Sequence, residues 1–353
     1  MRLQTIGPND AAWAEALART PHDVYHTAAY VATDARRLEA EPVAVLVTDG
    51  ERQLFLPYLV RSCAHWAART SDVISPYGYP GLLLNEAGRD PNFAQAAWAT
   101  VIGEWKEAGH CSAFLRMHPI LSAGLGELLP SAGLCETGLT VAADLNLDEQ
   151  ALWMGLGHNH RRTLQRCTKE GFTARFVPLA EYLEPYREVY NQTMDRVKAH
   201  DAYYFDEAYF RALSQHPGVH CCIVEAGQHL AAACLFFESH GIVQAHLGGS
   251  ANDHYRQSPF HLCLYHAMLW AKSRGNRWLH LGGGVGGDND PLFMFKAGFS
   301  DARFSYQTAR LVLDEERYRQ WVEAAAAEQH ANAAELIDSN FFPAYRSRCL
   351  EKV

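Results

Sequence analysis

The feature that most constrains the fold is a pattern that occurs twice in the chain. In each half, an apolar segment at helical spacing ends at a glycine and is followed at once by a strand-like run: VIGEWKEAGHCSAFLRM at residues 101–117 and AMLWAKSRGNRWLHL at residues 267–281. A helix that ends at a glycine and leads into an apolar strand forms one supersecondary unit. Its repetition indicates an internal duplication and therefore two similar domains.

The segments before these two units also correspond. Residues 42–60 and 219–250 each contain apolar runs separated by turn residues, which is the pattern of antiparallel strands. A single crossover helix beside such strands in each half predicts an α+β fold with mixed central sheets. We expect a first domain at residues 1–147, a second domain at residues 148–312, and C-terminal helices at residues 313–353 that pack back on the first domain.

The expected elements follow the order of helices, an antiparallel meander, a helix and a strand. This order is similar to the GNAT acyltransferase fold, which the duplication would place twice in tandem. The length of the chain permits two domains, because 353 residues exceed the roughly 250–300 residues that one core supports. The sequence therefore predicts two tandem GNAT-like domains.

Composition and charge exclude several classes of protein. A net charge of −9 argues against a surface that coats a nucleic-acid duplex, so we expect no DNA partner, although a local contact with an RNA end is compatible with it. The longest apolar runs, such as Leu230–Phe237, are far shorter than the ~20 residues of a membrane helix, and the N-terminus lacks the apolar core of a signal peptide. We therefore expect a cytoplasmic protein that does not insert into membranes.

The cysteines and histidines give no recognisable metal pattern. Nine cysteines occur without any CxxC spacing, which together with the missing export signal predicts reduced thiols. His158 and His160 have the best spacing for metal ligands, but no acidic or cysteine ligand follows at a recognisable distance. We predict no metal site.

The glycine-rich stretch LGGGVGGDND at residues 281–290 matches a nucleotide-binding loop only formally. Gly282, Gly284 and Gly287 satisfy GxGxxG, but the remaining chain is too short for the βαβαβ unit that a dinucleotide domain needs. Asp288 occupies the position of the lysine in a Walker A loop, which excludes that motif. We interpret the glycines as a strand end kept free of side chains so that a substrate can pass close to the backbone.

The lysine that follows these glycines is a candidate catalytic residue. Asp288 or Asp290 can cap a short helix that has Pro291 in its first turn. Lys296 then lies among apolar side chains, namely Leu292, Phe293, Phe295 and Phe299. A lysine held in an apolar wall can stabilise a developing oxyanion, whereas a solvated surface lysine has no such role. The residues alone leave both interpretations of Lys296 open.

Five segments, in the same order along the chain, resemble the Fem-like aminoacyltransferases, a branch with two GNAT domains that includes peptidoglycan bridge-forming enzymes. The segments are SPYGYPG (75–81), HNHRRTLQRCTKEGF (158–172), YNQTMDRVKAHDAYYF (190–205), AHLGGS (245–250) and LHLGGG with LFMFKAGFS (279–300). The resemblance covers nearly the whole chain and implies transfer of an aminoacyl group from aminoacyl-tRNA to an amine, which forms an amide. Such a reaction needs no ATP, metal or other cofactor, because the ester is already activated and the protein chiefly orients two substrates and stabilises the oxyanion.

The resemblance also implies roles for individual residues. Phe295 matches the family's platform for the 3′ end of the tRNA, and Lys296 matches the oxyanion donor. His246 stands where many relatives carry an aromatic residue, and it is either a donor to the carbonyl or a packed strand histidine. A basic helical stripe either grips acceptor-stem phosphates or is a solvated helix face. The stripe consists of Arg161, Arg162, Arg166 and Lys169.

Further residues are candidates for binding the acceptor. Arg196 matches a family position associated with anionic acceptors, or it forms an interdomain salt bridge, and Tyr204 is close enough in sequence to line the same cleft. Tyr77 and Tyr79 lie on a turn-rich loop that is either a substrate wall or a structural turn. Arg116 ends a strand of the first domain, from which it can reach the cleft.

The loop before the helix expected at residues 259–273 bears on whether the acyl donor is acyl-CoA or aminoacyl-tRNA. GNAT acetyltransferases hold the CoA pyrophosphate with the pattern R/Q-x-x-G-x-G/A, and here Pro259 and His261 stand at its two small positions after Arg256. Bulky side chains obstruct the backbone amides that wrap a pyrophosphate, so an aminoacyl-tRNA donor is favoured. The alternative is a GNAT-type acyl-CoA-dependent N-acyltransferase that acts on a small amine or sugar amine. The expected acceptor is the amine of a small peptide, a natural-product precursor or a muropeptide.

Overall fold

The computed structural model describes residues 1–65, 70–130, 133–339 and 341–347. The end of the region expected to form C-terminal helices, residues 348–353, lies outside the described residues.

Contacts within the chain divide it into two compact units. The first unit consists of Met1–Pro21, Tyr25–Glu136 and Gln307–Val353. The second unit consists of His22–Val24 and Thr137–Tyr306. Apart from the short segment His22–Val24, the chain passes between the units within strand β7 (Leu134–Asp144) and again within strand β13 (Arg303–Val312), whereas the sequence-based limits lie after residues 147 and 312. An apolar pattern locates a strand, but it does not reveal that the strand begins in one unit and ends in the other.

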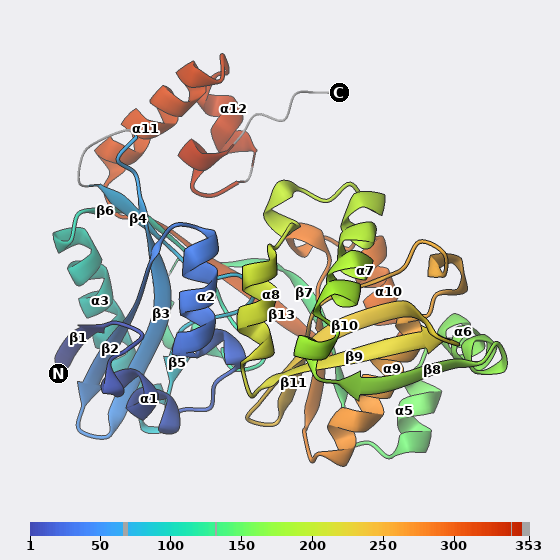
Figure 1. The fold of residues 1–353 in the computed structure, drawn as a ribbon. Coiled ribbons are helices and arrows are strands. Elements are labelled where there is room, and N and C mark those ends of the chain that lie inside the picture. The colour runs from blue at the N-terminus through green and yellow to red at the C-terminus, as the bar shows by residue number, and fades with distance from the viewer. Residues whose placement is uncertain (66–69, 131–132, 340, 348–353) are drawn as a thin grey trace. The chain divides into compact units, whose positions relative to one another are not determined.

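The first unit is built on a sheet with the strand order β1-β2-β3-β4-β6-β13 (Figure 1), in which β4 and β6 are parallel and the other neighbours antiparallel. The strands are β1 (Arg2–Ile6), β2 (Glu41–Asp49), β3 (Arg52–Ser62), β4 (Ser71–Ile74), β6 (His110–Arg116) and the short β5 (Leu83–Leu84), which pairs with β3. The helices are α1 (Ala11–Ala18), α2 (Ala28–Arg37), α3 (Pro91–Glu107), α4 (Leu125–Leu128), α11 (Glu315–Glu328) and α12 (Ala333–Asp338).

Helices cover both faces of this sheet. Side chains along a strand alternate between the faces, so neighbouring residues of one strand pack against different helices. Val45 of β2 belongs to a core cluster with Trp98 of α3. Its neighbour Leu46 belongs to the cluster on the opposite face, with Trp13 of α1. The apolar run predicted as a strand is therefore buried on both sides, which explains why it is continuously apolar rather than alternating.

The C-terminal helices pack on the first unit, as predicted. Trp321 and Ala325 of α11 and Leu336 of α12 form a buried cluster with Cys63 and Cys111. Burial raises the pKa of both thiols to about 12, so these cysteines are packed as small apolar groups.

The second unit is built on a sheet with the strand order β7-β12-β11-β10-β9-β8, in which β11 and β12 are parallel and the other neighbours antiparallel. The strands that follow β7 are β8 (Phe172–Val177), β9 (Val219–Ala226), β10 (His229–Ser239), β11 (Ile242–Ser250) and β12 (Trp278–Gly282). The helices are α5 (Glu149–Gly155), α6 (His158–Lys169), α7 (Leu183–Arg196), α8 (Glu207–Ser214), α9 (Phe260–Ser273) and α10 (Pro291–Ala297).

Helices also cover the sheet of the second unit (Figure 1). One large core cluster joins Cys222 and Cys234 of the sheet to Leu164 of α6, Met268 of α9 and Phe293 of α10. On the other face, α7 lies against β10 and β11. Helix α10, which carries Lys296, is therefore attached to the main core of this unit by its own apolar residues.

The duplicated helix–glycine–strand unit is present in both halves. Helix α3 leads through Gly109 into β6, and helix α9 leads through Gly275 into β12. Both glycines have a positive φ, 78° and 80°, a conformation that favours glycine at a helix C-terminus. In each unit the strand after this helix pairs in parallel with an earlier strand. The α+β fold with mixed sheets is confirmed.

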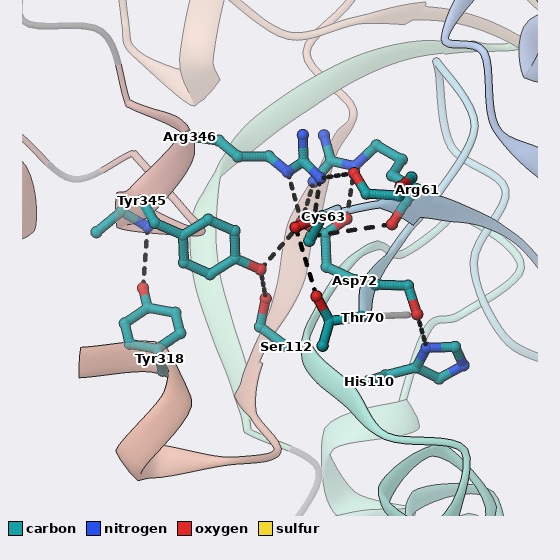
Figure 2. Close-up of polar contacts among 12 residues, drawn as sticks. Arg61, Cys63, Thr70, Asp72, His110, Ser112, Tyr318, Tyr345 and Arg346 are labelled. Carbon is teal, nitrogen blue, oxygen red and sulfur yellow. Dashed lines mark hydrogen bonds and ion pairs between the residues drawn. The ribbon is translucent and has the colours of Figure 1, made fainter. Parts of the chain in front are cut away.

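A buried carboxylate ties the C-terminal segment to the first unit. Asp72 of β4 is fully buried and accepts a 2.7 Å hydrogen bond from Nε of Arg61 in β3 (Figure 2). It also accepts hydrogen bonds from Nε of Arg346, at 2.6 Å, and from the hydroxyl of Tyr345, at 2.9 Å. The hydroxyl groups of Tyr345 and Ser112 of β6 are 2.7 Å apart. One carboxylate thus joins two strands to the 3-10 helix at Ala344–Arg346.

We expect Asp72→Asn to lower the free energy of unfolding by about 3 kcal/mol, because removing one partner of a buried ion pair leaves the other charge uncompensated. Urea denaturation of the full chain, followed by tryptophan fluorescence, measures the loss. The matched control is Asp49→Asn: Asp49 pairs with Arg52 but its side chain is 47% exposed, so we expect a loss below about 1 kcal/mol. Equal losses in the two variants would contradict the special role of Asp72.

Candidate active site

The second unit contains a pair of parallel strands whose mutual pairing ends before the strands do. β11 and β12 pair from Ile242 with Trp278 to Gln244 with His280, and the side chains of these last two residues are hydrogen-bonded to each other in the interior. Beyond that point β11 continues to Ser250, while β12 ends at Gly282. In the described chain the facing edges of the two strands are not paired with each other there, and unpaired strand edges can receive an extended ligand.

A capped helix directly after β12 positions the candidate lysine. Asp290 accepts hydrogen bonds from the backbone N–H of Phe293, at 2.8 Å, and from that of Val285, at 3.1 Å. Of the two aspartates expected as caps, Asp290 is the one that caps α10, with Pro291 in the first turn. The cap fixes where the helix begins and therefore the side of the helix from which Lys296 projects.

Lys296 is half-buried, and its ammonium group has a specific partner. Its Nζ donates a 2.6 Å hydrogen bond to the carbonyl oxygen of Gly283. Burial lowers the pKa of Lys296 to about 8, and the carboxylate of Asp290 acts in the opposite direction. Phe293 is buried as expected, whereas Leu292 is 41% exposed, so the apolar wall is incomplete. An ammonium group has three N–H donors, so those not used by the carbonyl can serve a ligand.

The glycines before this helix are required by close packing within the protein. A Cβ at Gly283 would lie 2.7 Å from the carbonyl oxygen of Leu139 in β7. A Cβ at Gly284 would lie 2.5 Å from a carboxylate oxygen of Asp290. Both distances are too short for a real side chain, so neighbouring protein atoms account for these two glycines, whereas we had expected a passing substrate to require them.

Phe295 lies within a cluster of aromatic and imidazole rings. Its ring centroid is 4.9 Å from that of His261, 5.4 Å from that of Phe299 and 5.6 Å from that of His160. The side chain is half-buried, so a nucleotide base would stack only on the part of the ring that this cluster leaves accessible. The role of Phe295 as a platform stays a prediction.

His246 is packed on the sheet by other aromatic residues. Its ring stacks on Phe237 with centroids 4.1 Å apart, and its Nε2 is 3.3 Å from the hydroxyl of Tyr209 in α8. Burial lowers the pKa of His246 to about 3, so the ring is neutral at pH 7. Ala245 packs on the core that contains α10, and alternation therefore directs His246 to the opposite face. These contacts match the interpretation of a packed strand histidine, and a role as donor stays a prediction.

The basic stripe of α6 is divided between structural and exposed cations. Arg161 donates to two backbone carbonyls at the end of α5, at 2.6 and 2.8 Å. Arg166 donates to the carbonyl of Gln257, at 2.9 Å, in the loop before α9. Arg162, Arg166 and Lys169 are exposed. Arg162 and Lys169 are nevertheless better placed to meet phosphates than Arg161 and Arg166, whose guanidinium groups are bonded to backbone carbonyls.

Arg196 and Tyr204 belong to the second unit and have partners there. Arg196 donates to the side-chain oxygen of Asn252, at 2.6 Å, and its guanidinium carbon lies 4.8 Å from the ring centroid of Tyr255. Arg196 also donates to the carbonyl of Ser250, at 3.2 Å, and these partners carry no charge. Tyr204 donates a 2.8 Å hydrogen bond to Asp195, and the carboxylate raises the pKa of Tyr204.

Tyr77, Tyr79 and Arg116 belong to the first unit. The backbone N–H of Tyr77 donates to the carboxylate of Asp34, at 2.8 Å, and the ring of Tyr79 lies edge-on to Tyr25 with centroids 6.1 Å apart. Arg116 donates to a backbone carbonyl at the start of the same loop, at 3.1 Å. These contacts are typical of a structural turn, and a role as substrate wall stays a prediction.

The loop before α9 is filled by the protein's own groups. The backbone N–H groups of His261 and Leu262 donate to the carbonyls of Ser258, at 3.2 Å, and Pro259, at 3.0 Å. The His261 ring packs on His160 with centroids 4.6 Å apart, and burial lowers the pKa of His261 to about 4. These amides in the first turn of α9, which a pyrophosphate would need, are therefore engaged by carbonyls of the loop, and the sequence has bulky residues at both small positions.

Sequence reasoning missed two groups that hold this site together. The Nε2 of His160 lies 2.8 Å from the carbonyl of Phe295, although His160 was considered only as a metal ligand. The carbonyl of Gly283 holds Lys296. Neither contact has a local sequence signal, whereas Asp290 was found because helix capping acts between residues that are close in sequence.

Two kinds of feature are absent from the described residues. No group of three or more histidine, cysteine, aspartate or glutamate side chains is arranged there to hold a metal ion. Among the helices of those residues, none combines the length and the apolar character that crossing a membrane requires.

Comparison with known proteins bears on the fold. Residues 158–291 match the family model of the acetyltransferase (GNAT) domain. The structure is similar to that of FemX, with a TM-score of 0.65 and 14% identity over 86% of this chain and 97% of that one. It is also similar to the C-terminal domain of a candidate lysylphosphatidylglycerol synthetase from Agrobacterium fabrum, with a TM-score of 0.56 and 14% identity over 84% of this chain and 90% of that one.

A third structure, a conserved protein of unknown function from Bacteroides thetaiotaomicron, has a TM-score of 0.56 and 10% identity over 88% of this chain and 99% of that one. No curated protein has a sequence that matches this chain. At these identities the structural likenesses establish the fold. With the matched domain they support a coarse assignment, an acyltransferase of the GNAT fold.

We expect Asp290→Asn to lower the pKa of Lys296 below its value of about 8. Asparagine retains the helix cap, but it removes the carboxylate that favours the charged form of the lysine. Competitive acetylation by acetic anhydride across a pH series, with mass spectrometry of the Lys296 peptide, measures the midpoint. The exposed Asp253→Asn is the control and should leave the midpoint unchanged. A higher midpoint in Asp290→Asn would show that the cap, rather than the charge, dominates.

Proposed function

We propose that the protein is an aminoacyltransferase that transfers an aminoacyl group from aminoacyl-tRNA to the amine of a small peptide, natural-product precursor or muropeptide. The product is an amide, and the reaction needs no cofactor besides the charged tRNA. It would take place in the cytoplasm, where charged tRNA is available. The proposal combines the GNAT fold shared with FemX, the segments that resemble Fem-like enzymes and the arrangement around Lys296.

The observation that carries the choice of donor is the filled loop before α9. The N–H groups of His261 and Leu262, in the first turn of α9, are hydrogen-bonded to carbonyls of this loop, and the imidazole of His261 packs beside Phe295. A CoA pyrophosphate depends on free backbone amides at a helix N-terminus. An aminoacyl ester on the 3′ end of a tRNA makes no such demand, because that end of a tRNA carries no pyrophosphate.

In the proposed reaction the acceptor amine attacks the ester carbonyl of the aminoacyl-tRNA. The C–N bond forms, the carbonyl oxygen becomes an oxyanion, and the C–O bond to the tRNA then breaks. The 3′-hydroxyl leaves with a proton, and the amine loses one. Lys296, as a cation, donates a hydrogen bond to the oxyanion, and its bond to Gly283 keeps the ammonium in place before the charge develops.

The tRNA itself is expected to contact exposed cations of the second unit. Arg162 and Lys169 on α6 are exposed and can meet acceptor-stem phosphates. Arg161 and Arg166 contribute positive charge nearby, although their guanidinium groups are bonded to backbone carbonyls. A local basic patch of this kind suits an otherwise acidic protein that binds one end of an RNA.

A second candidate function is acyl-CoA-dependent N-acylation of a small amine or sugar amine. The match of residues 158–291 to the acetyltransferase (GNAT) domain favours it. The two functions differ in the donor that they consume, so a donor assay separates them.

The test incubates the protein with charged tRNA pools and an amine mixture, and in parallel with acetyl-CoA and the same amines. We expect accelerated deacylation of tRNA with a new amide detected by mass spectrometry, and we expect Lys296→Met to lower kcat about 100-fold because it removes the oxyanion donor. Lys272→Met is the matched control, since Lys272 also donates to a backbone carbonyl, that of Leu145 at 2.9 Å. Consumption of acetyl-CoA alone would replace the proposal by the second function.

The pH dependence of kcat should reflect the titration of Lys296. The cation is the active form and its pKa is about 8, so activity is present below pH 8 and falls as the pH rises through that value. We expect Lys296→Arg to remove this descending limb, because arginine stays protonated above pH 12. Rates measured from pH 6 to 10 provide the test. Activity that instead rises through pH 8 in the wild type and is flat in the variant would identify neutral Lys296 as a base.

A further inference from the structure

The C-terminal end of α10 meets the N-terminal end of α6. The last carbonyls of any helix lack partners within the helix, and in a helix as short as α10 they form a large share of its backbone acceptors. At this end, the carbonyl of Phe295 accepts a 3.2 Å hydrogen bond from the backbone N–H of Gly298, and two further bonds come from α6 and the residue before it. The backbone N–H of Gly157 donates to the carbonyl of Gly298, at 2.8 Å, and Nε2 of His160 donates to the carbonyl of Phe295, at 2.8 Å.

The imidazole of His160 packs directly against the end of α10. A Cβ at Gly298 would lie 2.3 Å from Cε1 of His160, so the ring occupies the space that any side chain at this position would need. The ring also packs on Phe299 and His261, with centroids 4.6 Å away in both cases. His160 is therefore held by packing on the sides and by a hydrogen bond at its tip.

The imidazole of His160 acts as a neutral donor. Burial lowers its pKa, so the ring is uncharged at pH 7, and the bond to Phe295 requires the proton to be on Nε2. His261 is neutral as well, and its Nδ1 donates to the carbonyl of Ser258 at 3.1 Å. The two imidazoles are thus polar contacts of fixed direction within an otherwise apolar cluster.

We infer that His160 is a positioning residue for Lys296: by holding the carbonyl of Phe295, the residue directly before the lysine, it fixes the last turn of α10 so that the ammonium reaches Gly283. The N-terminal end of the same helix is fixed by Asp290. A helix of seven residues anchored at both ends can place one side chain to within the tolerance that transition-state stabilisation requires. The catalytic consequence of this inference rests on the proposed function, whereas the geometric part does not.

The surroundings of Lys296 set its pKa, so a displacement of the ammonium group would change that pKa. Burial holds the pKa of Lys296 at about 8, against opposing effects of Asp290 and Cys234. If the last turn of α10 loses its anchor, the ammonium moves toward solvent and its titration midpoint rises toward the ordinary lysine value of about 10.4. That midpoint reports the position of Lys296 without any assay of activity.

The test compares His160→Phe, which keeps a packed ring but removes the N–H donor, with His160→Gln, which keeps a donor. We expect the Lys296 midpoint, measured by competitive acetylation and mass spectrometry, to rise by about one pH unit or more in the Phe variant and to stay near the wild-type value in the Gln variant. His261→Phe is the control, because the bond of His261 goes to Ser258 rather than to α10. It should leave the midpoint unchanged.

Kinetics add a second readout. In an active enzyme, His160→Phe should lower kcat about tenfold with little change in KM for the donor, and His160→Gln should restore most of kcat. If the Phe variant does not fold, His160→Ala removes the donor without steric demand and gives the same comparison. An unchanged Lys296 midpoint in the folded Phe or Ala variant overturns the inference. A shifted midpoint together with no transfer from any charged tRNA overturns the proposed function and leaves the positioning role standing.

Discussion

The candidate site of the second unit depends on where the pairing of the parallel strands β11 and β12 ends. β11 and β12 are paired as far as Gln244 and His280. After β12 comes a glycine-rich turn, and the chain then packs on the core again through α10. Lys296 reaches the carbonyl of Gly283 because its helix begins beside the end of the strand that precedes it. The end of the strand pairing and the position of the lysine therefore follow from the same course of the chain, and Phe293 attaches this segment to the core.

The candidate site contains a short helix, α10, that is stabilised by contacts with other parts of the unit. A helix as short as α10 is not stable by itself in water, so its geometry must come from its contacts. Asp290 satisfies donors at its start, and Gly157 and His160 satisfy acceptors at its end. The same contacts that stabilise the helix orient Lys296. This coupling suits a residue proposed to stabilise an oxyanion, because a donor that is already oriented need not reorganise when the charge develops.

Local patterns predicted much of this arrangement. The duplicated helix–glycine–strand units, with Gly109 and Gly275 at positive φ, follow from helix-ending preferences that act within a few residues. The cap at Asp290 follows in the same way. The basic stripe of α6 shows what local patterns do not predict. Arg161 and Arg166 lie on the same helix as Arg162 and Lys169, yet their guanidinium groups are bonded to carbonyls at the end of α5 and in the loop before α9. Helical spacing indicates which residues share a face, but not what that face meets.

By itself, the sequence determined which segments form helices and strands, where several of them end, and that the whole is a duplicated α+β fold. These outcomes depend on backbone conformation and apolar periodicity, which are properties of neighbouring residues. Only the tertiary structure decided which carbonyl holds Lys296, that His160 anchors its helix, and that His246 is packed on the opposite face of the sheet from α10. The physical reason is that burial, and with it the pKa of a lysine or histidine, is set by groups that folding brings together from distant parts of the chain.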